Sequence, residues 1–564
     1  MRGQLEAYFD VAFTAPDGVK RLRELILSLA VQGKLTDQRD SDEPASELLK
    51  KIAVEKKKLE KEGKIKKQKP LLPVGDDEKP YTLPKGWEWV RLGEVGHDLG
   101  QMTPQNDFTY IDVSSINNVT GKILSNPQVL KSFNAPSRAR KIVNNKTLLF
   151  STVRPYLLNT AIVEVDYDIL PIASTAFSIL HPYKDIYVEF IFLFVRSTYF
   201  IHYVNKIMKG VAYPAITDCE FRQGALPLPP LAEQQRIVER VNTLMARCDA
   251  LEAIHKEQEH KRNSARAAAM HAITMPQGTT DLALAFNRNW GFLVRHFEQL
   301  FTTKQDVAEL RKTILQLAVM GKLTDQSGSD EPASELLKKI TAEKKKLEKE
   351  GNIKKQKPMP PVADDEKPYA LPKGWEWVRL GEMCSKITDG DHHTPKRIAS
   401  GKRLLSAKNV RDGYLDFSTC DFISDTDYEK SRKRCFPQEG DILIVSVGGT
   451  IGRSAIVPQD ASFALVRSVA LIKNIFSYPD LIKYFMDAKI LQAQIHSKKR
   501  GGAQPCLYLS EIENLLFPLP PLAEQQRIVE RVNSLMSLCD TLEERIEART
   551  QTQDNLLNAV VAMA

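Results

Sequence analysis

The sequence LPPLAEQQRIVERVN runs from Leu228 to Asn242 and returns unchanged from Leu519 to Asn533, an offset of 291 residues. Two prolines near its start favour the beginning of a helix. The apolar residues that follow are four, three, four and three residues apart, which is the heptad pattern of a coiled-coil seam. In the first copy they are Ile237, Val241, Leu244, Cys248 and Leu251. The pattern predicts a helix of roughly 40 residues, or about 60 Å at 1.5 Å per residue.

The second copy keeps this rhythm and carries it to the end of the chain. Its apolar residues are Ile528, Val532, Leu535, Cys539, Leu542, Ile546, Leu556, Val560 and Met563. Two such helices in one chain most simply pair with each other as an antiparallel coiled coil. The alternative is that each helix packs on its own head, because short heptad runs also occur in ordinary globular helices.

A longer block, Leu22 to Glu94, also occurs twice and returns almost unchanged from Leu310 to Glu382, an offset of 288 residues. It includes GKLTDQ, DEPASELLKKI, EKKKLEKEG and LPKGWEWVRLGE. The two offsets differ by three, so the segments between the repeated blocks have nearly equal lengths. The whole chain therefore reads as an internal duplication with pseudo-twofold character.

Each copy of the longer block is expected to begin with helices. Two phenylalanines precede an amphipathic stretch whose apolar residues share one helical face before a glycine stop. A second helix, rich in Glu, Lys and Leu, is expected from Glu43 to Glu62, with Gly63 at its end. Trp87, Trp89 and Val90 then predict the first strand of a globular head. The residues of the first stretch are Phe9, Phe13, Leu22, Ile26, Leu29, Ala30 and Gly33.

The two heads, roughly His97 to Ala225 and Ser385 to Leu516, share only scattered residues. In TLLFSTVRPYLLNTAIV (Thr147 to Val163) and DILIVSVGGTIGRSAIV (Asp441 to Val457), two β-branched runs flank a turn. KGVAYPAI, from Lys209, likewise parallels RGGAQPCL, from Arg500. Scaffold positions persist while exposed polar positions vary, which is expected of two recognition domains with different targets.

These patterns predict an α+β protein with two mixed α/β target-recognition domains separated by two long antiparallel coiled-coil helices. The expected domains are 1–82 (helical repeat), 83–228 (first recognition domain), 229–272 (central long helix), 273–370 (second helical repeat), 371–519 (second recognition domain) and 520–564 (C-terminal long helix).

Composition fits this organisation, because 564 residues are too many for one core and 42% hydrophobic content is ordinary for globular domains. A net charge of +8 is compatible with a polyanionic partner without demanding one. The start lacks the layout of a signal peptide, and the most apolar stretch is too short to span a bilayer, so we expect a cytoplasmic protein. The seven cysteines include no CxxC pair, which predicts reduced structural thiols.

LPLPPLAEQQRIVERV at the end of each head, the tandem layout, and the motifs APSRARKIV, LLFSTVRPYL, ITDGDHHTPK and GGTIG resemble the specificity subunits of type I restriction-modification systems. DEPASELLKKI and LPKGWEWVRLGE further resemble the subgroup with long conserved repeats. The resemblance implies a non-catalytic DNA-recognition subunit in which each head reads one half of a split asymmetric site.

The resemblance also implies partners and cofactors. Two modification subunits would bind S-adenosylmethionine and methylate adenine, and restriction subunits would use ATP and Mg to translocate DNA. These cofactors would belong to the partners, with none in this chain. Consistently, the sequence has no GxxxxGK[ST] phosphate loop and no NPPF-like or DPPY-like tetrapeptide.

Arg and Lys on turns can neutralise phosphates, and Arg, Lys, Asn and Gln can read base edges. For any single one of these residues the alternative is a solvated loop side chain. The candidates in the first head are Arg138, Arg140, Lys141, Arg154, Tyr156, Lys209 and Tyr213. Those in the second head are His393, Thr394, Lys396, Lys408, Asn409, Arg432, Lys433, Arg434, Arg453, Lys498, Lys499, Arg500 and Gln504.

Two other functions compete with this one. A fused nuclease or methyltransferase would need acidic residues such as Asp389 and Asp391 to hold magnesium, but the catalytic motifs are missing. His392 and His393 are adjacent and lack a third ligand at metal-binding spacing, so no metal site is expected there. A coiled-coil scaffold with two protein-binding heads is the other alternative.

Overall fold

The structure, a computed structural model, describes residues 15, 17–67, 70–124, 127–274, 282–393, 395–501 and 505–562. Phe9, Phe13 and Met563 of the sequence predictions lie outside these residues. The chain divides into two compact units. Unit 1 comprises Met1–Glu259 with Thr550–Ala564, and unit 2 comprises His260–Arg549.

Unit 1 begins with the two predicted helices, α2 (Gly18–Val31) and α3 (Ala45–Lys61). α2 ends as expected at Gly33, which has a φ of +70°. A Cβ atom at this glycine would lie 2.5 Å from the ring of Pro84, so glycine is required by both conformation and space. α3 ends in the same way, with Gly63 at a φ of +68°.

In the described residues, the head of unit 1 contains four small sheets. β1, in the predicted first strand, pairs antiparallel with β12, so the two ends of the head meet. The other sheets have the strand orders β6-β3-β10-β7 and β2-β11-β8-β9, and β4 pairs with β5. The strands are β1 (Glu88–Arg91), β2 (Gly96–His97), β3 (Phe108–Ile111), β4 (Ile116–Asn117), β5 (Lys122–Ile123), β6 (Gln128–Leu130), β7 (Ala139–Ile142), β8 (Leu148–Ser151), β9 (Thr160–Ile162), β10 (Pro171–Ser174), β11 (Phe177–Pro182) and β12 (Ala225–Leu228).

Helices α4 (Val188–Val195), α5 (Thr198–Ile207) and α6 (Asp218–Gln223) complete this head. Their aromatic side chains fill its core, where the ring of Phe150 from β8 stacks on Phe221 with centroids 4.9 Å apart. Phe200 packs edge-on against both rings. The hairpin β8–β9 is therefore anchored on helices that follow it in the sequence.

Unit 2 repeats this plan. β13 pairs with β21, and the other sheets have the orders β14-β20-β17-β18 and β16-β15-β19. Its strands are β13 (Glu376–Arg379), β14 (Cys384–Asp389), β15 (Lys402–Leu405), β16 (Asp421–Ile423), β17 (Ile442–Val445), β18 (Ser454–Ile456), β19 (Ala464–Leu465), β20 (Val469–Asn474) and β21 (Leu516–Leu519). Its helices include α8 (Leu282–Arg295), α9 (Phe297–Leu300), α10 (Lys304–Val319), α11 (Ala333–Lys349), α12 (Leu380–Met383), α13 (Asp425–Arg434), α14 (Pro479–Asp487), α15 (Lys489–Lys498) and α16 (Leu509–Glu513).

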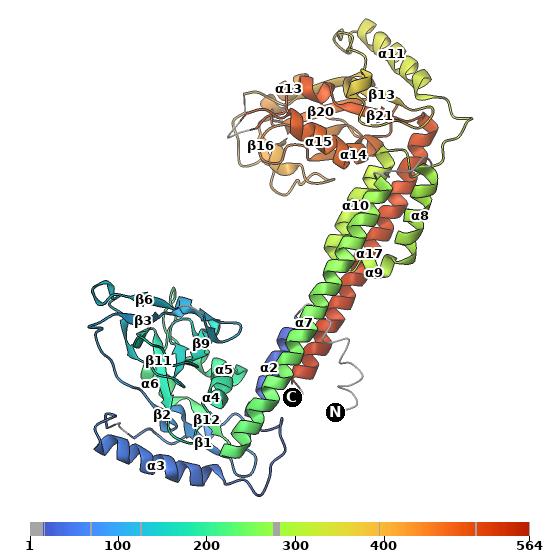
Figure 1. Ribbon diagram of the computed structural model, residues 1–564. Helices are drawn as coiled ribbons and strands as arrows, with labels where there is room; N and C mark the ends of the chain where they lie inside the picture. Colours follow the sequence, from blue (N-terminus) through green and yellow to red (C-terminus); the bar gives the residue numbers. More distant parts are fainter. Residues whose placement is uncertain are drawn as a thin grey trace. The chain divides into compact units, whose positions relative to one another are not determined.

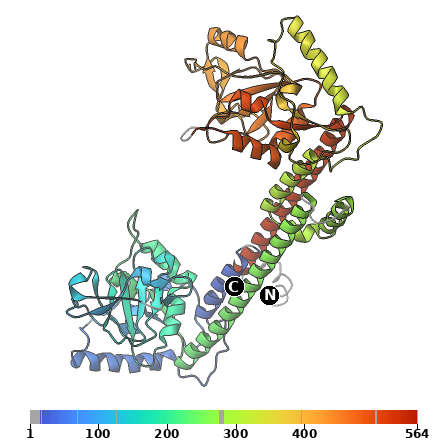
Figure 2. The ribbon, with the colours of Figure 1, turned by 45° about the horizontal axis from the view of Figure 1, so that its top comes forward.

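The duplicated helix α3 has the same place in unit 1 as α11 has in unit 2. Each runs beside the strands of its own head (Figures 1 and 2). α3 buries only Ala45, Leu48 and Ile52, and α11 buries their counterparts Ala333, Leu336 and Ile340. Most of the Lys and Glu side chains on both helices are therefore left for solvent or for a partner.

The two predicted long helices are α7 (Leu231–Thr274) and α17 (Leu522–Ala562). Their early seam positions are buried within their own units. Ile237, Val241 and Cys248 belong to the unit 1 core that also holds α2, and the corresponding residues Ile528, Val532 and Cys539 belong to the unit 2 core with α10. Both cores also contain head residues, such as Phe190 and Phe485, so these contacts support the alternative in which each helix packs on its own head. The pairing of the two long helices as a coiled coil stays a prediction.

The last turns of both long helices have a different environment. Ala269, Met270 and Ile273 of α7 pack with Leu300 and Leu317 in unit 2. In unit 1, Leu557 of α17 packs with Leu25 of α2. Each long helix thus contributes residues to both units.

Candidate nucleic-acid interface

The predicted turn between β8 and β9 is built around Arg154, whose backbone is left-handed with a φ of +48°. Its N–H donates to the carbonyl of Pro214 at 2.8 Å, and its Nη2 donates to the carbonyl of Ala212 at 3.0 Å. The guanidinium lies over the ring of Tyr213, 4.7 Å from the centroid. Two loops that are distant in the sequence are joined by these contacts, which bring together the candidates Arg154, Tyr213 and Lys209.

A third loop, between β4 and β5, lies against the same turn. Asn118 donates from Nδ2 to the carbonyl of Leu157 at 3.1 Å. Residues 117–121, 153–158 and 209–215 are called here the unit 1 three-loop cluster. Its exposed side chains include Val119, Tyr156, Val211 and Tyr213. The sequence interpretation missed loop 117–121, although NNVTG between short β-branched runs is a turn signal.

Unit 2 brings together the described residues of the corresponding segments, 411–415, 446–453, 500–501 and 505–506. Gly448 N–H donates to the carbonyl of Pro505 at 3.0 Å, and Gly413 N–H donates to the carbonyl of Ser454 at 3.2 Å. Arg453 lies 3.3 Å from Asp412. These segments form the unit 2 three-loop cluster, in which Tyr414 is 61% exposed.

In each cluster, the third loop begins with a cation that lies near a carboxylate. Lys209 lies 3.9 Å from Glu220, and Arg500 lies 2.7 Å from the equivalent Glu511. Both cations are more than two-thirds exposed, so they can also reach a polyanion. The candidate Gln504 lies outside the described residues.

The candidates on and beside β7 have different environments. Arg138 is exposed and pairs with Asp112 at 2.8 Å, and this carboxylate raises the pKa of the guanidinium. Arg140 is partly buried and donates to the carbonyl of Ser137 at 3.0 Å. Lys141, by contrast, is buried and pairs with Asp218 at 2.5 Å. We therefore withdraw Lys141 as a DNA contact, because its ammonium is already used to join β7 to α6.

Asn409 is also withdrawn. It is fully buried, and its Oδ1 accepts from the Ser406 N–H at 3.0 Å while its Nδ2 donates to the carbonyl of Asp416 at 3.0 Å. These bonds hold a turn inside the fold. Its neighbour Lys408 is half exposed and shares Asp421 with Arg397, at 3.0 and 2.9 Å.

The remaining unit 2 candidates lie outside the three-loop cluster or at its edge. Arg434 donates to Asp389 at 2.7 Å and contacts His392 at 2.8 Å, so one of the acidic residues considered for magnesium is already paired. Arg432 stacks on Phe436, 3.9 Å from the ring centroid. Lys498 donates to the carbonyl of Asn514 at 2.8 Å, and burial lowers its pKa. His393, Lys396, Lys433 and Lys499 are exposed, and Thr394 lies outside the described residues.

Comparison with known proteins assigns this architecture to a family. Residues 84–261 and 372–551 each match the family model described as the type I restriction modification DNA specificity domain. The chain is 34% identical over 563 residues to the type I restriction enzyme EcoAI specificity subunit of Escherichia coli, covering 97% of this chain and 94% of that protein. It is 33% identical to the EcoEI specificity subunit of the same species, with the same coverage. The chain belongs to the specificity subunits of type I restriction-modification systems.

Among solved structures, the HsdS subunit from Thermoanaerobacter tengcongensis is 25% identical and matches 85% of this chain and 98% of its own, with a TM-score of 0.45. As a specificity subunit, the protein serves DNA sequence recognition in a restriction-modification complex and is not itself catalytic. The described part of the chain contains no group of three or more His, Cys, Asp and Glu that could hold a metal ion. Within the same residues, no helix is long and apolar enough to cross a membrane.

The duplicated motifs of the specificity subunit meet at a buried carboxylate in each unit. Glu233 accepts hydrogen bonds from Trp87 at 2.9 Å, Gln38 at 2.6 Å and Thr36 at 3.1 Å. Glu524 accepts the equivalent bonds in unit 2, from Trp375 at 2.8 Å and from Gln326 and Thr324 at 3.0 Å. The GKLTDQ, GWEW and AEQQ motifs therefore contribute to one hydrogen-bonded junction in each unit.

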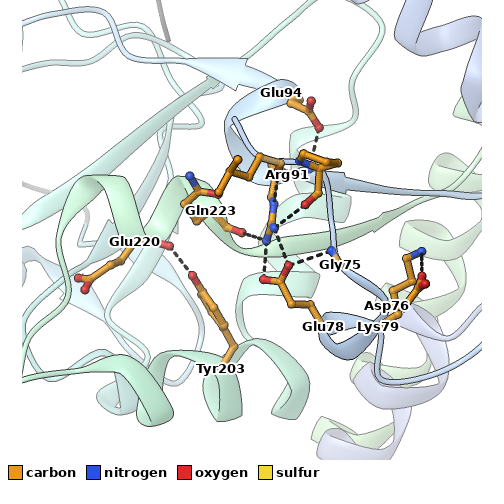
Figure 3. A network of polar contacts seen from close by, with 11 residues as sticks. Gly75, Asp76, Glu78, Lys79, Arg91, Glu94, Tyr203, Glu220 and Gln223 are labelled. Carbon is orange, nitrogen blue, oxygen red and sulfur yellow. Dashed lines mark hydrogen bonds and ion pairs between the residues drawn. The ribbon is translucent and has the colours of Figure 1, made fainter. Parts of the chain in front are cut away.

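A second duplicated network fixes the linker that follows α3. Arg91 is buried, and Figure 3 shows its guanidinium between Glu78 and the carbonyl of Gln223. Nη2 donates to Glu78 at 2.6 Å, Nη1 donates to Gln223 at 2.6 Å, and Nε donates to the carbonyl of Leu72 at 2.8 Å. In unit 2, Nη2 of Arg379 donates to both carboxylate oxygens of the equivalent Glu366, at 3.0 and 2.8 Å. Each recognition head thus stands on a rigid and nearly identical base.

Proposed function

We propose that each three-loop cluster reads one half of a bipartite, asymmetric double-stranded DNA site. The contrast within the chain carries this proposal: the bases of the two units share most of their residues and hydrogen bonds, whereas the loops above them carry different side chains. Unit 1 presents Arg154, Tyr156, Lys209 and Tyr213, and unit 2 presents Tyr414, Arg453, Lys499 and Arg500. Loops on a rigid scaffold commonly carry recognition, and cations there can bind phosphates or base edges.

The duplicated base suits two copies of one partner, since identical surfaces bind identical partners. We assign this role to two modification subunits, with α3 and α11 among the surfaces they contact. Salt bridges on the outer faces of these helices are themselves duplicated. Lys51 pairs with Glu43 and Lys339 pairs with Glu331, each at 2.6 Å.

In this proposal the methyl donor S-adenosylmethionine is bound by the modification subunits, and ATP and Mg by the restriction subunits. The specificity subunit contributes recognition and assembly, and it acts in the cytoplasm where chromosomal DNA is found. The two long helices set the spacer between half-sites, because α7 and α17 each contribute residues to both units.

The test is methylation of a duplex library by the purified complex of this chain with its modification subunits. The library carries two randomised segments with spacers of varied length, and sequencing of the methylated molecules reveals the preferred site. We expect two specified segments separated by an unspecified spacer of constant length. A contiguous motif would contradict the proposal, and sequence-independent retention of DNA would favour the protein-binding scaffold.

A further inference from the structure

Arg196, at the end of α4, donates hydrogen bonds to two loops of the unit 1 three-loop cluster and so joins them. Its Nη1 donates to the carbonyl of Leu158 at 3.0 Å, and its Nη2 donates to the carbonyls of Asn118 and Val119 at 2.8 and 3.1 Å. The first carbonyl ends the turn that carries Arg154, and the other two belong to loop 117–121. One guanidinium therefore helps to hold together two loops that are distant in the sequence and that Asn118 and Leu157 also join.

The residues around Arg196 hold its guanidinium in place. Its guanidinium stacks on Phe192, 5.3 Å from the ring centroid. Gly121 lies so close to this ring that a Cβ atom would come within 2.3 Å of Phe192 Cζ. Its φ of +68° also favours glycine. Burial lowers the pKa of Arg196 to about 10, so the side chain still carries its charge at neutral pH.

In unit 2, the equivalent helices α14 and α15 contact the hairpin turn through different residues. The offset of 291 places Lys483 at the position of Phe192 and Asp487 at that of Arg196, and these two side chains form an ion pair. Asp487 accepts from Ser454 Oγ at 3.3 Å. Gln492 of α15 donates from Nε2 to the carbonyl of Gly452 at 3.1 Å. The side chains that hold the loops therefore differ between the two units, as the loops themselves do. The junction at Glu233 and Glu524, by contrast, is the same in both units.

We propose that Arg196 is a positioning residue for half-site specificity: it holds the unit 1 loops at the geometry that reads DNA without touching the DNA. This inference rests on the proposed function. Three of its five N–H donors are used by backbone carbonyls, so this arginine is engaged in holding the loops. Recognition side chains lose discrimination when the residues that support them no longer hold their geometry.

The experiment compares Arg196→Met, Arg196→Lys and the wild type, each in complex with the modification subunits. Binding is measured on the duplex selected from the library and on duplexes with single substitutions in either half-site. Arg247→Met is the matched control, because Arg247 is an exposed arginine of α7 in the same unit. Hydrogen exchange of residues 117–121 and 153–158 reports whether the loops have separated.

For Arg196→Met we expect a loss of about 10- to 100-fold in discrimination at the half-site read by unit 1, comparable to one base-edge contact. Discrimination at the other half-site and the salt dependence of binding should not change. Arg196→Lys should recover part of the loss, because it restores a donor and the charge. Arg247→Met should behave as the wild type.

Two results would overturn the inference. Equal weakening on all sequences with a shallower salt dependence would make Arg196 a phosphate contact. If hydrogen exchange of the loops becomes faster but discrimination between duplex sequences is unchanged, the contacts of Arg196 do not contribute to recognition. A wild-type complex that discriminates at neither half-site would instead refute the proposed function, so the two failures are distinguishable.

Gly121→Ala provides a second route if Arg196→Met fails to fold. The added methyl group must displace either loop 117–121 or the Phe192 ring on which Arg196 stacks, so it disturbs this contact without removing the guanidinium. Gly100→Ala is its control, because Gly100 has a φ of +89° with no atom near its Cβ position. A unit 1 half-site defect in Gly121→Ala alone supports the inference, and equal behaviour of the two variants contradicts it.

Discussion

Trp87 donates a hydrogen bond from its indole Nε1 to the buried carboxylate of Glu233 at 2.9 Å. The two residues lie 146 positions apart, at opposite ends of the first recognition head. The bond therefore closes the head onto the beginning of α7. Unit 2 closes in the same way through Trp375 and Glu524.

Glu233→Gln should destabilise unit 1 by about 1–3 kcal/mol. The carboxylate uses both oxygens to accept three hydrogen bonds, whereas an amide offers one oxygen and leaves a buried donor without an acceptor. Urea unfolding followed by hydrogen exchange in unit 1 measures the loss. Glu239→Gln is the control, because Glu239 is an exposed residue of the same helix. Equal stability of the two variants would contradict this account of the junction.

His181 should make unit 1 sensitive to acid. Burial, with His97 nearby, lowers the pKa of His181 to about 4, below its ordinary value of 6.5. The folded unit therefore resists protonation of this ring, and the unfolded chain binds the extra proton. Its contribution to stability is fully present above about pH 6.5 and is lost as the pH falls toward 4.

The measurement is the free energy of unfolding of unit 1 across this pH window, for the wild type and for His181→Gln. The variant should show a weaker pH dependence by up to one proton. In the equivalent strand of unit 2, Lys473 takes the place of this histidine and pairs with Asp441 at 2.6 Å. Identical pH profiles for the variant and the wild type would exclude this role of His181.

Arg154→Ala should impair only the half-site read by unit 1, and Arg453→Ala only the other. Each residue lies on the hairpin turn of its own three-loop cluster. If either guanidinium bonds a guanine edge, the loss should be about 1–3 kcal/mol with relaxed preference at one base pair. Competition binding with singly substituted duplexes measures it. Uniform weakening on every sequence would assign the residue to phosphate instead.

Two modification subunits should bind one specificity subunit, because the base is duplicated. Native mass spectrometry should show this two-to-one complex. Reversing the charges of Lys50, Lys51 and Lys57 on α3 should leave a one-to-one complex. The same change at Lys338, Lys339 and Lys345 on α11 should do so independently. A limit of one partner for the unchanged chain at saturation would refute the duplicated docking surface.

The elements with strong local patterns could be predicted from the sequence, but their partners could not. The spacing of Ile237, Val241 and Cys248 identified a helix with one buried face. It did not reveal that α2 covers this face, because an apolar stripe specifies burial and not the element that buries it. The hairpins were predicted for the same local reason, since two β-branched runs flank a turn.

The same holds for the candidate site, where local patterns identified residues but not their contacts. Arg154 and Tyr213 were identified as separate turn residues, and the contact between them comes from folding. Lys141 appeared to be a surface cation because its partner, Asp218, is 77 residues away. Asn409 appeared to be a base reader because a polar residue beside a lysine gives no sign of burial. Long-range contacts decided each of these cases.

Lengthening both long helices should change the preferred spacer between half-sites. The heptads alone suggest insertion after Leu251 and after Leu542. The boundaries between the two units instead favour insertion after Glu259 and after Arg549. Insertion at those earlier positions would separate Arg23 from Glu252, and Arg311 from Glu543, which pair within their own units at 3.2 Å.

A heptad in each helix adds about 10 Å at 1.5 Å per residue, or about three base pairs of DNA. The added turns also rotate one unit about the helix axis, so the spacer can change by fewer base pairs. Extending one helix alone should mainly destabilise the protein, because the last turns of α7 and α17 would no longer both reach their packing sites near Leu317 and Leu25. Methylation of a spacer library by the doubly extended complex is the test. An unchanged spacer preference in a folded, active complex would show that these helices do not set the spacing.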